Sequence, residues 1–259
     1  MNSNHKINGF ELVRRPSSAI EKAAPGAKHV MAGMVAETIA LAETKALIEI
    51  SPNKSPLLEN WYRQGIKFYF GKDVPQNYSE AVNWWHKAAE RGHAKAQYNL
   101  SICYADGEGV SQNYAEATKW LYKAAQNGVS NAQVEVGWAY QNGHHVNGQL
   151  VPPNTAEAVK WYRVAAEQGY ADGQYHLGFM YGIGWGIPQN KSEAMKWYRL
   201  AAEQGNANAQ NALGSYYEQG EVVPKDHAEA IKWFRKAAEQ GHEIAQANLD
   251  SEVEDSEED

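Results

Sequence analysis

The stretch AAEQGNANAQNALGSYYEQGEVVPKDHAEAIKWFRKAAEQG, residues 201–241, decides the fold because it begins and ends with the same five letters. The motif occurs three more times upstream, as AAERG at 88–92, AAQNG at 124–128 and AAEQG at 165–169. The closing glycines are therefore 36 residues apart, except for one step of 41. A fixed period of this length is typical of a solenoid, in which each repeat leaves an apolar face for its neighbours to cover.

The five repeats share a frame when they are aligned on those glycines. It reads A-x-A-Q-x-x-L-G-x-x-Y-x-x-G, a short loop, and then A-x-x-W-Y-x-x-A-A-E-Q-G. Bulky aromatic residues beside small alanines predict the large and small partners of a packed helix pair, so we expect the tryptophan row to be buried scaffold. That row is Trp84, Trp120, Trp161, Trp197 and Trp233, and the residues that follow it are Trp85, Leu121, Tyr162, Tyr198 and Phe234.

Composition and length agree with one elongated, all-α domain. The 259 residues are rich in helix formers, and most of the nine prolines fall in linkers and loops. Cys103 is the single cysteine, so no disulfide can form within the chain and packing must hold the repeats together. The closing glycine of each motif can adopt the left-handed conformation that ends a helix, which predicts two helices per repeat.

The sequence divides into four predicted segments. Residues 1–28 are expected to be loosely ordered, and 29–56 to form a helix (about 30–50) followed by the linker SPNKSP. The solenoid is predicted for 57–250, with repeats at 57–92, 93–128, 129–169, 170–205 and 206–241 and a capping helix at 242–250. The last ten residues contain seven acids and no base, so 251–259 are expected to be a disordered acidic tail.

The frame resembles the Sel-one-like repeat (SLR) of the tetratricopeptide-like superfamily, over about residues 57–250. The resemblance implies antiparallel helix pairs stacked in a right-handed superhelix with a concave and a convex face. We further expect capping helices at both ends of this chain's solenoid. It also implies an adaptor that assembles protein complexes. The chain departs from the family pattern in its additional N-terminal helix and in the longer loop of repeat 3.

Candidate catalytic and metal sites are weak in this sequence. Cys103 lies within a predicted helix and has no indicated His and Asn or Asp partners, so packing is expected rather than nucleophilic catalysis. His144 and His145 are adjacent in a loop without nearby Cys or acid, which makes a poor metal site. The glycines of GIGWG at 182–186 match DGEGV at 106–110 and mark an inter-helix turn. We therefore expect no enzyme activity, no metal and no cofactor.

Charge and hydropathy limit the classes of partner. The net charge of −7 equals the charge of the last ten residues, so the rest is neutral and has no basic patch for nucleic acid. The most apolar stretch, 29–50, contains four charged residues and Gly33, which excludes a membrane span there. The N-terminus has no secretory signal pattern, and a cytoplasmic location is expected. The oligomeric state stays open.

Alignment with tetratricopeptide-like pairs places two positions of each first helix on the concave face. They are Tyr62, Ile66, Tyr98, Ile102, Val134, Trp138, Tyr175 and Phe179 in repeats 1 to 4, and the polar Asn211 and Ser215 in repeat 5. One interpretation is that these side chains pack between adjacent first helices. The other is that they form an exposed row for an extended or helical partner segment. The inserted loop of repeat 3 is a second candidate contact, through His144, His145, Pro152 and Pro153.

The function predicted from these patterns is a non-enzymatic adaptor or scaffold that binds another protein in its concave groove. The alternative is an inhibitor or immunity protein that occludes a bacterial toxin or effector. An enzyme would need a convergent polar site, which the sequence does not show. The helix predicted for 30–50 is expected to cap repeat 1, with occupation of the groove as the alternative.

Overall fold

The computed structural model describes residues 55–146 and 149–257. The segment predicted for 1–28 and the helix predicted for 30–50 lie outside these residues. In the described part, eleven helices and one β-hairpin follow in the order α2 (Pro56–Phe70), α3 (Tyr78–Ala89), α4 (Ala94–Asp106), α5 (Tyr114–Gln126), α6 (Ser130–Asn142), β1 (His144–Val146), β2 (Gln149–Val151), α7 (Thr155–Glu167), α8 (Ala171–Ile183), α9 (Lys191–Glu203), α10 (Ala207–Gln219), α11 (His227–Ala238) and α12 (Glu243–Glu257).

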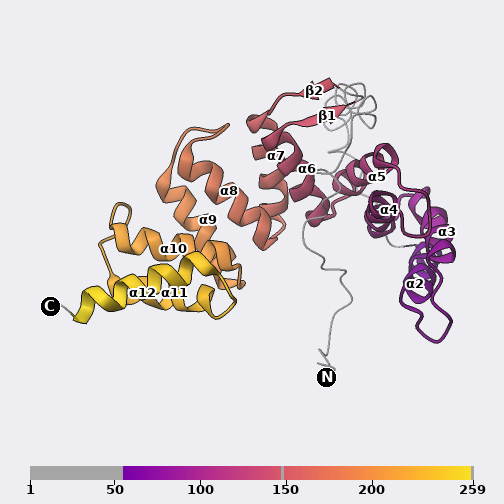
Figure 1. Ribbon diagram of the computed structural model, residues 1–259. Helices are drawn as coiled ribbons and strands as arrows, with labels where there is room; N and C mark the ends of the chain where they lie inside the picture. Colours follow the sequence, from indigo (N-terminus) through magenta and orange to yellow (C-terminus); the bar gives the residue numbers. More distant parts are fainter. Residues whose placement is uncertain (1–54, 147–148, 258–259) are drawn as a thin grey trace.

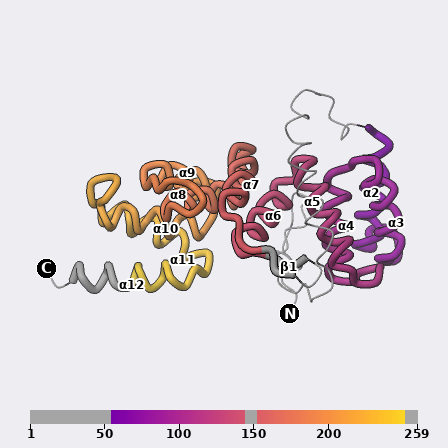
Figure 2. The backbone as a smooth tube through the Cα atoms, turned by 90° about the horizontal axis from the view of Figure 1, so that it is seen from above, coloured from indigo at the N-terminus to yellow at the C-terminus, as the bar shows by residue number. Residues whose placement is uncertain are grey.

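The helices form one curved row, with α2 and α3 at one end and α12 at the other (Figure 1). The view from above shows the same order, with the indigo and yellow helices at opposite ends (Figure 2). Each repeat is a first helix and a second helix: α2/α3, α4/α5, α6/α7, α8/α9 and α10/α11. The predicted all-α repeat solenoid is therefore confirmed, and α12 stands at the end as a first helix without a partner.

Both ends of the second helices are set by residues of the repeated frame. Each begins at an Asn or Asp whose side chain accepts a hydrogen bond from a backbone N–H two or three residues further on, which satisfies a donor left free at a helix start. These caps are Asn77, Asn113, Asn154, Asn190 and Asp226. The closing glycines that follow the helices have positive φ, between 82° and 92°, which few other residues adopt without strain.

The fully buried row consists of the bulky residues that directly follow the tryptophans in the sequence. Its five members, Trp85, Leu121, Tyr162, Tyr198 and Phe234, are at most 5 % exposed. In the tryptophan row, Trp120 and Trp233 are buried, whereas Trp84, Trp161 and Trp197 are only partly buried. Our expectation for the whole row was thus wrong for these three. One position along a helix turns a side chain by about 100°, which is enough to carry it from the core to the outer side.

Each buried ring packs directly against a glycine of the first helix. A Cβ at Gly137 would lie 2.7 Å from the Tyr162 ring, and one at Gly214 would lie 2.6 Å from the Phe234 ring. Gly178 meets Tyr198 in the same way, and Gly65 approaches Trp85 more closely still. The Leu-Gly element of the frame therefore makes room for an aromatic ring.

Repeat 2 differs from the others at both members of this glycine–ring pair. Its glycine position holds Ser101, and the opposite position holds Leu121 in place of an aromatic ring. Both residues are buried. A larger residue on the first helix is thus matched by a smaller one on the second, as constant core volume requires.

A buried glutamine joins each repeat to the one before it. In repeat 3, the Gln133 amide nitrogen donates to the Ala125 carbonyl at the end of α5 (3.1 Å), and its oxygen accepts from Gln168 at the end of α7 (2.9 Å). Repeats 2, 4 and 5 make the same bridge with Gln97, Gln174 and Gln210. Each of these carbonyls also accepts the N–H of the closing glycine, as Ala125 does from Gly128 (3.1 Å), so the glutamine adds a further hydrogen bond to it. The bridges explain the frame's two glutamine positions.

The insertion of repeat 3 forms a short antiparallel β-hairpin. β1 pairs with β2 with His144 opposite Val151 and Val146 opposite Gln149. The intervening sequence is Asn147-Gly148, the dipeptide most typical of a two-residue hairpin loop. The regular frame resumes where the Asn154 N–H donates to the Tyr140 carbonyl (2.7 Å). The hairpin is thus an addition at the loop edge of an otherwise all-α array.

The end of the solenoid differs from the prediction. We expected a capping helix at 242–250 and a disordered tail at 251–259, but α12 continues to Glu257. The stretch contains neither proline nor glycine, and glutamate is a good helix former, which accounts for the longer helix. Asp250 occupies the position of the ring-facing glycine, is exposed, and accepts a hydrogen bond from Gln246 (2.7 Å). An aromatic ring could not pack there, so α12 closes the stack.

Candidate protein-binding surface

Several first helices contact one another directly. Among helices that are not consecutive in the chain, α6 and α8 make the most extensive backbone contact. Side chains also join first helices directly: Tyr98 of α4 bonds Glu135 of α6 (2.7 Å), and Asn248 of α12 bonds Asn211 of α10 (3.0 Å). Successive first helices therefore contact one another at α4–α6, α6–α8 and α10–α12, and the predicted groove positions lie on these helices and on α2.

The earlier of the two groove positions is used for packing. Tyr98 is 9 % exposed and its hydroxyl donates to the buried Glu135 carboxylate, so it is not available to a partner. This corrects the prediction that Tyr98 lies in an open groove. Val134 packs against the central core, and the Tyr175 ring lies 5.9 Å from that of Tyr198. Tyr98 thus contacts the next first helix, whereas Tyr175 contacts the second helix of its own repeat.

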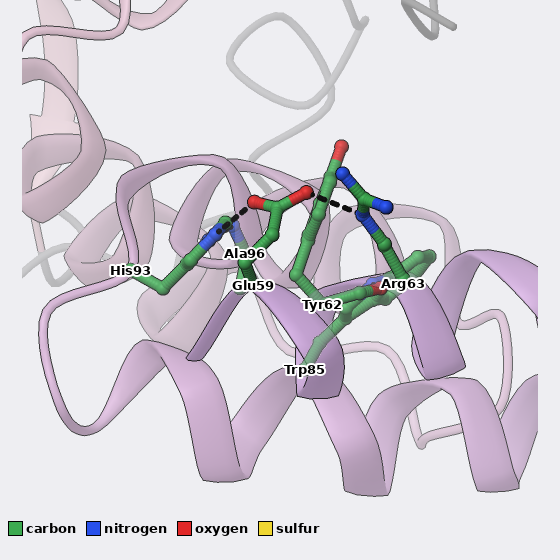
Figure 3. Close-up of polar contacts among 6 residues, drawn as sticks. All are labelled: Glu59, Tyr62, Arg63, Trp85, His93 and Ala96. Atoms are coloured by element: carbon green, nitrogen blue, oxygen red, sulfur yellow. Dashed lines mark hydrogen bonds and ion pairs between the residues drawn. The ribbon is translucent and has the colours of Figure 1, made fainter. Parts of the chain in front are cut away.

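Tyr62 is held in the same way between repeats 1 and 2 (Figure 3). Its ring stacks on His93 with the centroids 4.7 Å apart, and its carbonyl accepts from the Trp85 indole (3.2 Å). The His93 Nδ1 accepts from the Ala96 N–H (3.2 Å), so in the neutral ring Nε2 carries the proton and donates to Glu59 (3.4 Å). Burial lowers the pKa of His93, which favours this neutral form. Tyr62 is therefore structural.

The later groove position remains partly exposed in repeats 1 to 4. Its residues are Ile66, Ile102, Trp138 and Phe179, one on each of α2, α4, α6 and α8. We call this set the inner row. All four are half-buried, and repeat 5 ends the row with the polar Ser215. Ile66, Ile102 and Phe179 also pack against the buried clusters, so the inner row is an apolar strip of half-covered side chains across four helices.

Three buried titratable groups, Glu135, His176 and Cys103, have pKa values shifted by burial. Burial raises the pKa of Glu135 to about 7, and the hydrogen bond from Tyr98 partly offsets this effect. Burial lowers the pKa of His176 to about 4, and its ring stacks on Tyr162 at 4.7 Å. Cys103 is 1 % exposed and burial raises its pKa to about 12, so its thiol stays protonated. In residues 55–146 and 149–257, no three His, Cys, Asp or Glu side chains are placed to hold a metal ion.

A second apolar surface lies on the outer side of repeats 3 and 4. In repeats 1, 2 and 5 a lysine covers the tryptophan of its own helix: Lys87 lies 4.1 Å from the Trp84 ring centroid, and Lys123 and Lys236 do the same over Trp120 and Trp233. The aligned residues in repeats 3 and 4 are Val164 and Leu200, 42 % and 44 % exposed. Together with Trp161 and Trp197 they form what we call the outer patch. The sequence signal for this patch is the absence of lysine at the aligned position in these two repeats, and it gains its meaning from the lysine–tryptophan contacts of the other three.

The inserted hairpin adjoins a third exposed apolar site. His144 and His145 lie on β1, and Pro152 and Pro153 are exposed between β2 and α7. The turn between α8 and α9 lies against the start of α7, since a Cβ at Gly186 would lie 2.4 Å from the Thr155 backbone. That turn carries the exposed Trp185 and Ile183. The hairpin and the turn thus lie on one edge of repeats 3 and 4, and partner contact there remains a prediction.

The family model of the Sel1 repeat matches residues 61–93, 94–129, 130–170, 171–206 and 207–242, which is more than half of the chain. The chain belongs to the Sel1 repeat family. A solved Sel1 repeat protein from Oxalobacter formigenes is similar, with 30 % identity and a TM-score of 0.65, over 84 % of this chain and 86 % of that one. This agreement supports the assignment of the helix-pair solenoid.

Two further solved structures resemble the chain less closely in three dimensions. One is c5321, a protective antigen of uropathogenic Escherichia coli with an SLR fold: 34 % identity, TM-score 0.49, over 74 % of this chain and 48 % of that one. This Sel1 chain therefore spans about half the length of that antigen. The other is the immunity protein Pa5087 of Pseudomonas aeruginosa: 25 % identity, TM-score 0.46, over 74 % and 69 %. No curated protein matches the sequence significantly.

The Sel1 frame accounts for the positions that the structure found to be structural. Its alanines, glutamines, glycines and tyrosines hold one repeat on the next, so residues outside the frame carry what is particular to this chain. Across the described ranges, none of the helices has the length and apolar character needed to cross a bilayer. The inner row, the outer patch and the hairpin edge are the candidate contact surfaces of this Sel1 repeat protein.

Proposed function

We propose that this Sel1 repeat protein is a non-enzymatic adaptor or scaffold that binds another protein through its inner row. The observation that supports the proposal most is that Ile66, Ile102, Trp138 and Phe179 stay partly exposed on four successive first helices. A strip of apolar side chains with a central tryptophan and phenylalanine is typical of the few anchoring residues that dominate binding energy. The packed neighbours on either side would hold these anchors in place.

The shape of the inner row favours a helical or extended segment as the ligand. Packed helices are about 8–10 Å apart, so the row offers one apolar contact at each such interval. An amphipathic helix that presents apolar residues two turns apart has a matching spacing of about 11 Å. The proposal is therefore recognition of a partner segment, without a chemical reaction.

The experiment is affinity capture with the full-length protein, followed by mass spectrometry and titration with the partner identified. Trp138→Ala with Phe179→Ala should abolish binding, while Trp197→Ala on the outer patch should leave it unchanged. Thermal melts of the variants show whether each is folded. Retained binding by a folded Trp138→Ala/Phe179→Ala protein would show that the inner row is not the site. A captured toxin whose activity is lost on binding would favour the inhibitor interpretation over the adaptor.

A further inference from the structure

The tryptophans of the outer patch lack a cation that the aligned tryptophans have. In repeats 1, 2 and 5 the residue three positions after the tryptophan is a lysine, whose ammonium nitrogen lies 4.1 Å or 4.3 Å from the ring centroid. In repeats 3 and 4 that position holds Val164 and Leu200. Among the residues that the structure describes, no lysine or arginine takes this place over Trp161 or Trp197. These two rings therefore have no cation of their own.

Val164 and Leu200 cover only part of the ring surface that a lysine would cover. A lysine side chain runs through Cβ, Cγ, Cδ and Cε to its ammonium nitrogen, whereas valine ends at Cγ and leucine at Cδ. The two residues therefore take the place of the aliphatic stem and end before the position of the ammonium group. Both are exposed, and both tryptophans are only half-buried, so a group from another molecule can reach that position.

The C-terminal ends of α7 and α9 also favour a positive charge. The last carbonyls of a helix carry a partial negative charge, which a basic residue in the last turn offsets. The second helices α3, α5 and α11 each have a basic residue there, but α7 and α9 have none. Both helices end instead in an exposed glutamate, Glu167 and Glu203. The helix ends and the uncovered rings therefore favour the same kind of ligand group, a cation.

The basic side chains next to the two tryptophans are engaged elsewhere. Each lysine directly before a tryptophan pairs with the glutamate three residues before that lysine, and each arginine two residues after a tryptophan donates to the tyrosine hydroxyl of the following first helix. These pairs are Lys160–Glu157, Lys196–Glu193, Arg163–Tyr181 and Arg199–Tyr217. A cation over these rings must therefore come from another molecule.

The two cation positions belong to one part of the surface. The helices α7 and α9 both pack against α8, and Trp161 and Trp197 both border the same core cluster. A ligand that occupies both positions binds more tightly than two separate cations, because its second contact forms within one complex. Exposed valine and leucine beside the rings add apolar contacts that a small hydrated cation cannot use. These features favour a polypeptide with several basic side chains over a single small cation.

We propose that the outer patch binds a protein segment with at least two lysine or arginine residues, whose cations lie over Trp161 and Trp197. Apolar groups of the same segment contact Val164 and Leu200. The partner thus supplies the cations that repeats 1, 2 and 5 provide from their own helices. Two exposed cation–π contacts together change an affinity by about five- to thirtyfold. This surface is separate from the inner row, so the inference goes beyond the proposed function and does not depend on it.

The test is titration of the full-length protein with a fluorescein-labelled peptide of alternating lysine and leucine, followed by fluorescence anisotropy. Val164→Lys/Leu200→Lys supplies both cations from within the chain and should weaken peptide binding about tenfold. This variant restores the residue of the other repeats, so it should remain folded, as a thermal melt verifies. Asn83→Lys/Ala228→Lys is the charge-matched control on exposed positions of α3 and α11, and it should bind like the wild type. The acidic last ten residues are present in every variant, so their effect cancels.

Three outcomes would overturn the inference. The first is equal affinity of the peptide for the wild type and for Val164→Lys/Leu200→Lys. The second is an equal loss with Asn83→Lys/Ala228→Lys, because overall charge would then be the cause. The third is undiminished binding of a peptide with glutamine in place of lysine, which would show an apolar site that needs no cation. Trp138→Ala with Phe179→Ala should leave peptide binding unchanged, and a loss there would place the peptide on the inner row and contradict the inference.

Discussion

Repeat 1 and the interior repeats differ at the same pair of aligned positions. Interior repeats place two amide side chains there, as in Gln97 and Asn127, and the inner glutamine reaches back to a carbonyl of the preceding helix. Repeat 1 has Trp61 and Arg91 instead, stacked at 5.0 Å. A glutamine buried without an upstream carbonyl would lose a hydrogen bond, whereas an aromatic ring under a guanidinium needs none. The glutamine position therefore marks the side of a repeat that packs against the preceding repeat.

The largest expected effect comes from the ring-facing glycine of an interior repeat. Gly137→Val should destabilise the protein by about 3 kcal/mol or more, because its side chain would overlap the Tyr162 ring. Urea denaturation followed by circular dichroism measures the change. Ser101→Ala is the control at the aligned position of repeat 2, where a Cβ is already accommodated, and should cost less than about 1 kcal/mol. Equal costs at both positions would contradict the proposed volume matching.

The second largest loss of stability is expected when the glutamine bridge is removed. Gln133→Leu leaves the Gln168 amide nitrogen without this partner and removes one of the hydrogen bonds to the Ala125 carbonyl, which keeps the Gly128 N–H; the two lost hydrogen bonds should cost about 1–2 kcal/mol. In repeat 1, Arg91→Ala should cost only about 0.5–1 kcal/mol, since it removes a partly exposed cation–π contact. Both variants are compared by urea denaturation. A larger loss for Arg91→Ala would mean that the first repeat is the more tightly held of the two.

Glu135 should make stability depend on pH. Its carboxyl has a pKa of about 7 in the folded protein, above the ordinary value of 4.5, because it is buried. The folded state thus holds the proton more tightly, so this contribution is complete below about pH 4.5 and is lost as the pH rises through 7. Glu135→Gln should therefore gain stability relative to the wild type between pH 5.5 and pH 8. His176, with its pKa lowered, is present in both proteins and cancels.

The smallest effect is expected on the outer patch. Val164→Lys restores the residue found in repeats 1, 2 and 5 and should stabilise the protein by at most about 0.5–1 kcal/mol, through a cation–π contact with Trp161. It should also reduce acrylamide quenching of tryptophan fluorescence. Val164→Ala is the control, because it removes apolar surface without providing a cover. Unchanged quenching by both variants would mean that Val164 does not border Trp161.

Most of the fold was predictable because the decisive signals are local and repeated. The 36-residue period, the Asn caps and the closing glycines predict the helix pairs without any knowledge of long-range contacts. The burial of Trp161 and Trp197 was not predictable from hydrophobicity, since two adjacent bulky rows differ only by one position around the helix. The hairpin was missed although Asn147-Gly148 is a strong turn signal, and the length of α12 was missed because acidic composition was given more weight than helix propensity.

The candidate site was less predictable than the fold. Alignment identified the helix face, but Tyr62 and Tyr98 are engaged by the next repeat through His93 and Glu135. Those partners lie 31 and 37 residues further along the chain, where no local pattern links them. In the sequence, the outer patch corresponds to Val164 and Leu200, which replace the lysine of the other three repeats. Its recognition requires knowing that the lysine covers a ring, which only the three-dimensional contact shows.

The identical amide bridge at every interior junction has a consequence for how such a chain can change in length. Since each repeat offers the same carbonyl to its successor and the same glutamine to its predecessor, a duplicated or deleted block of 36 residues would rejoin without any new contact having to arise. Asp250 limits this freedom at one end, because its carboxylate replaces the glycine that would admit another ring. Tandem gene duplication could therefore extend the array from within but not beyond α12.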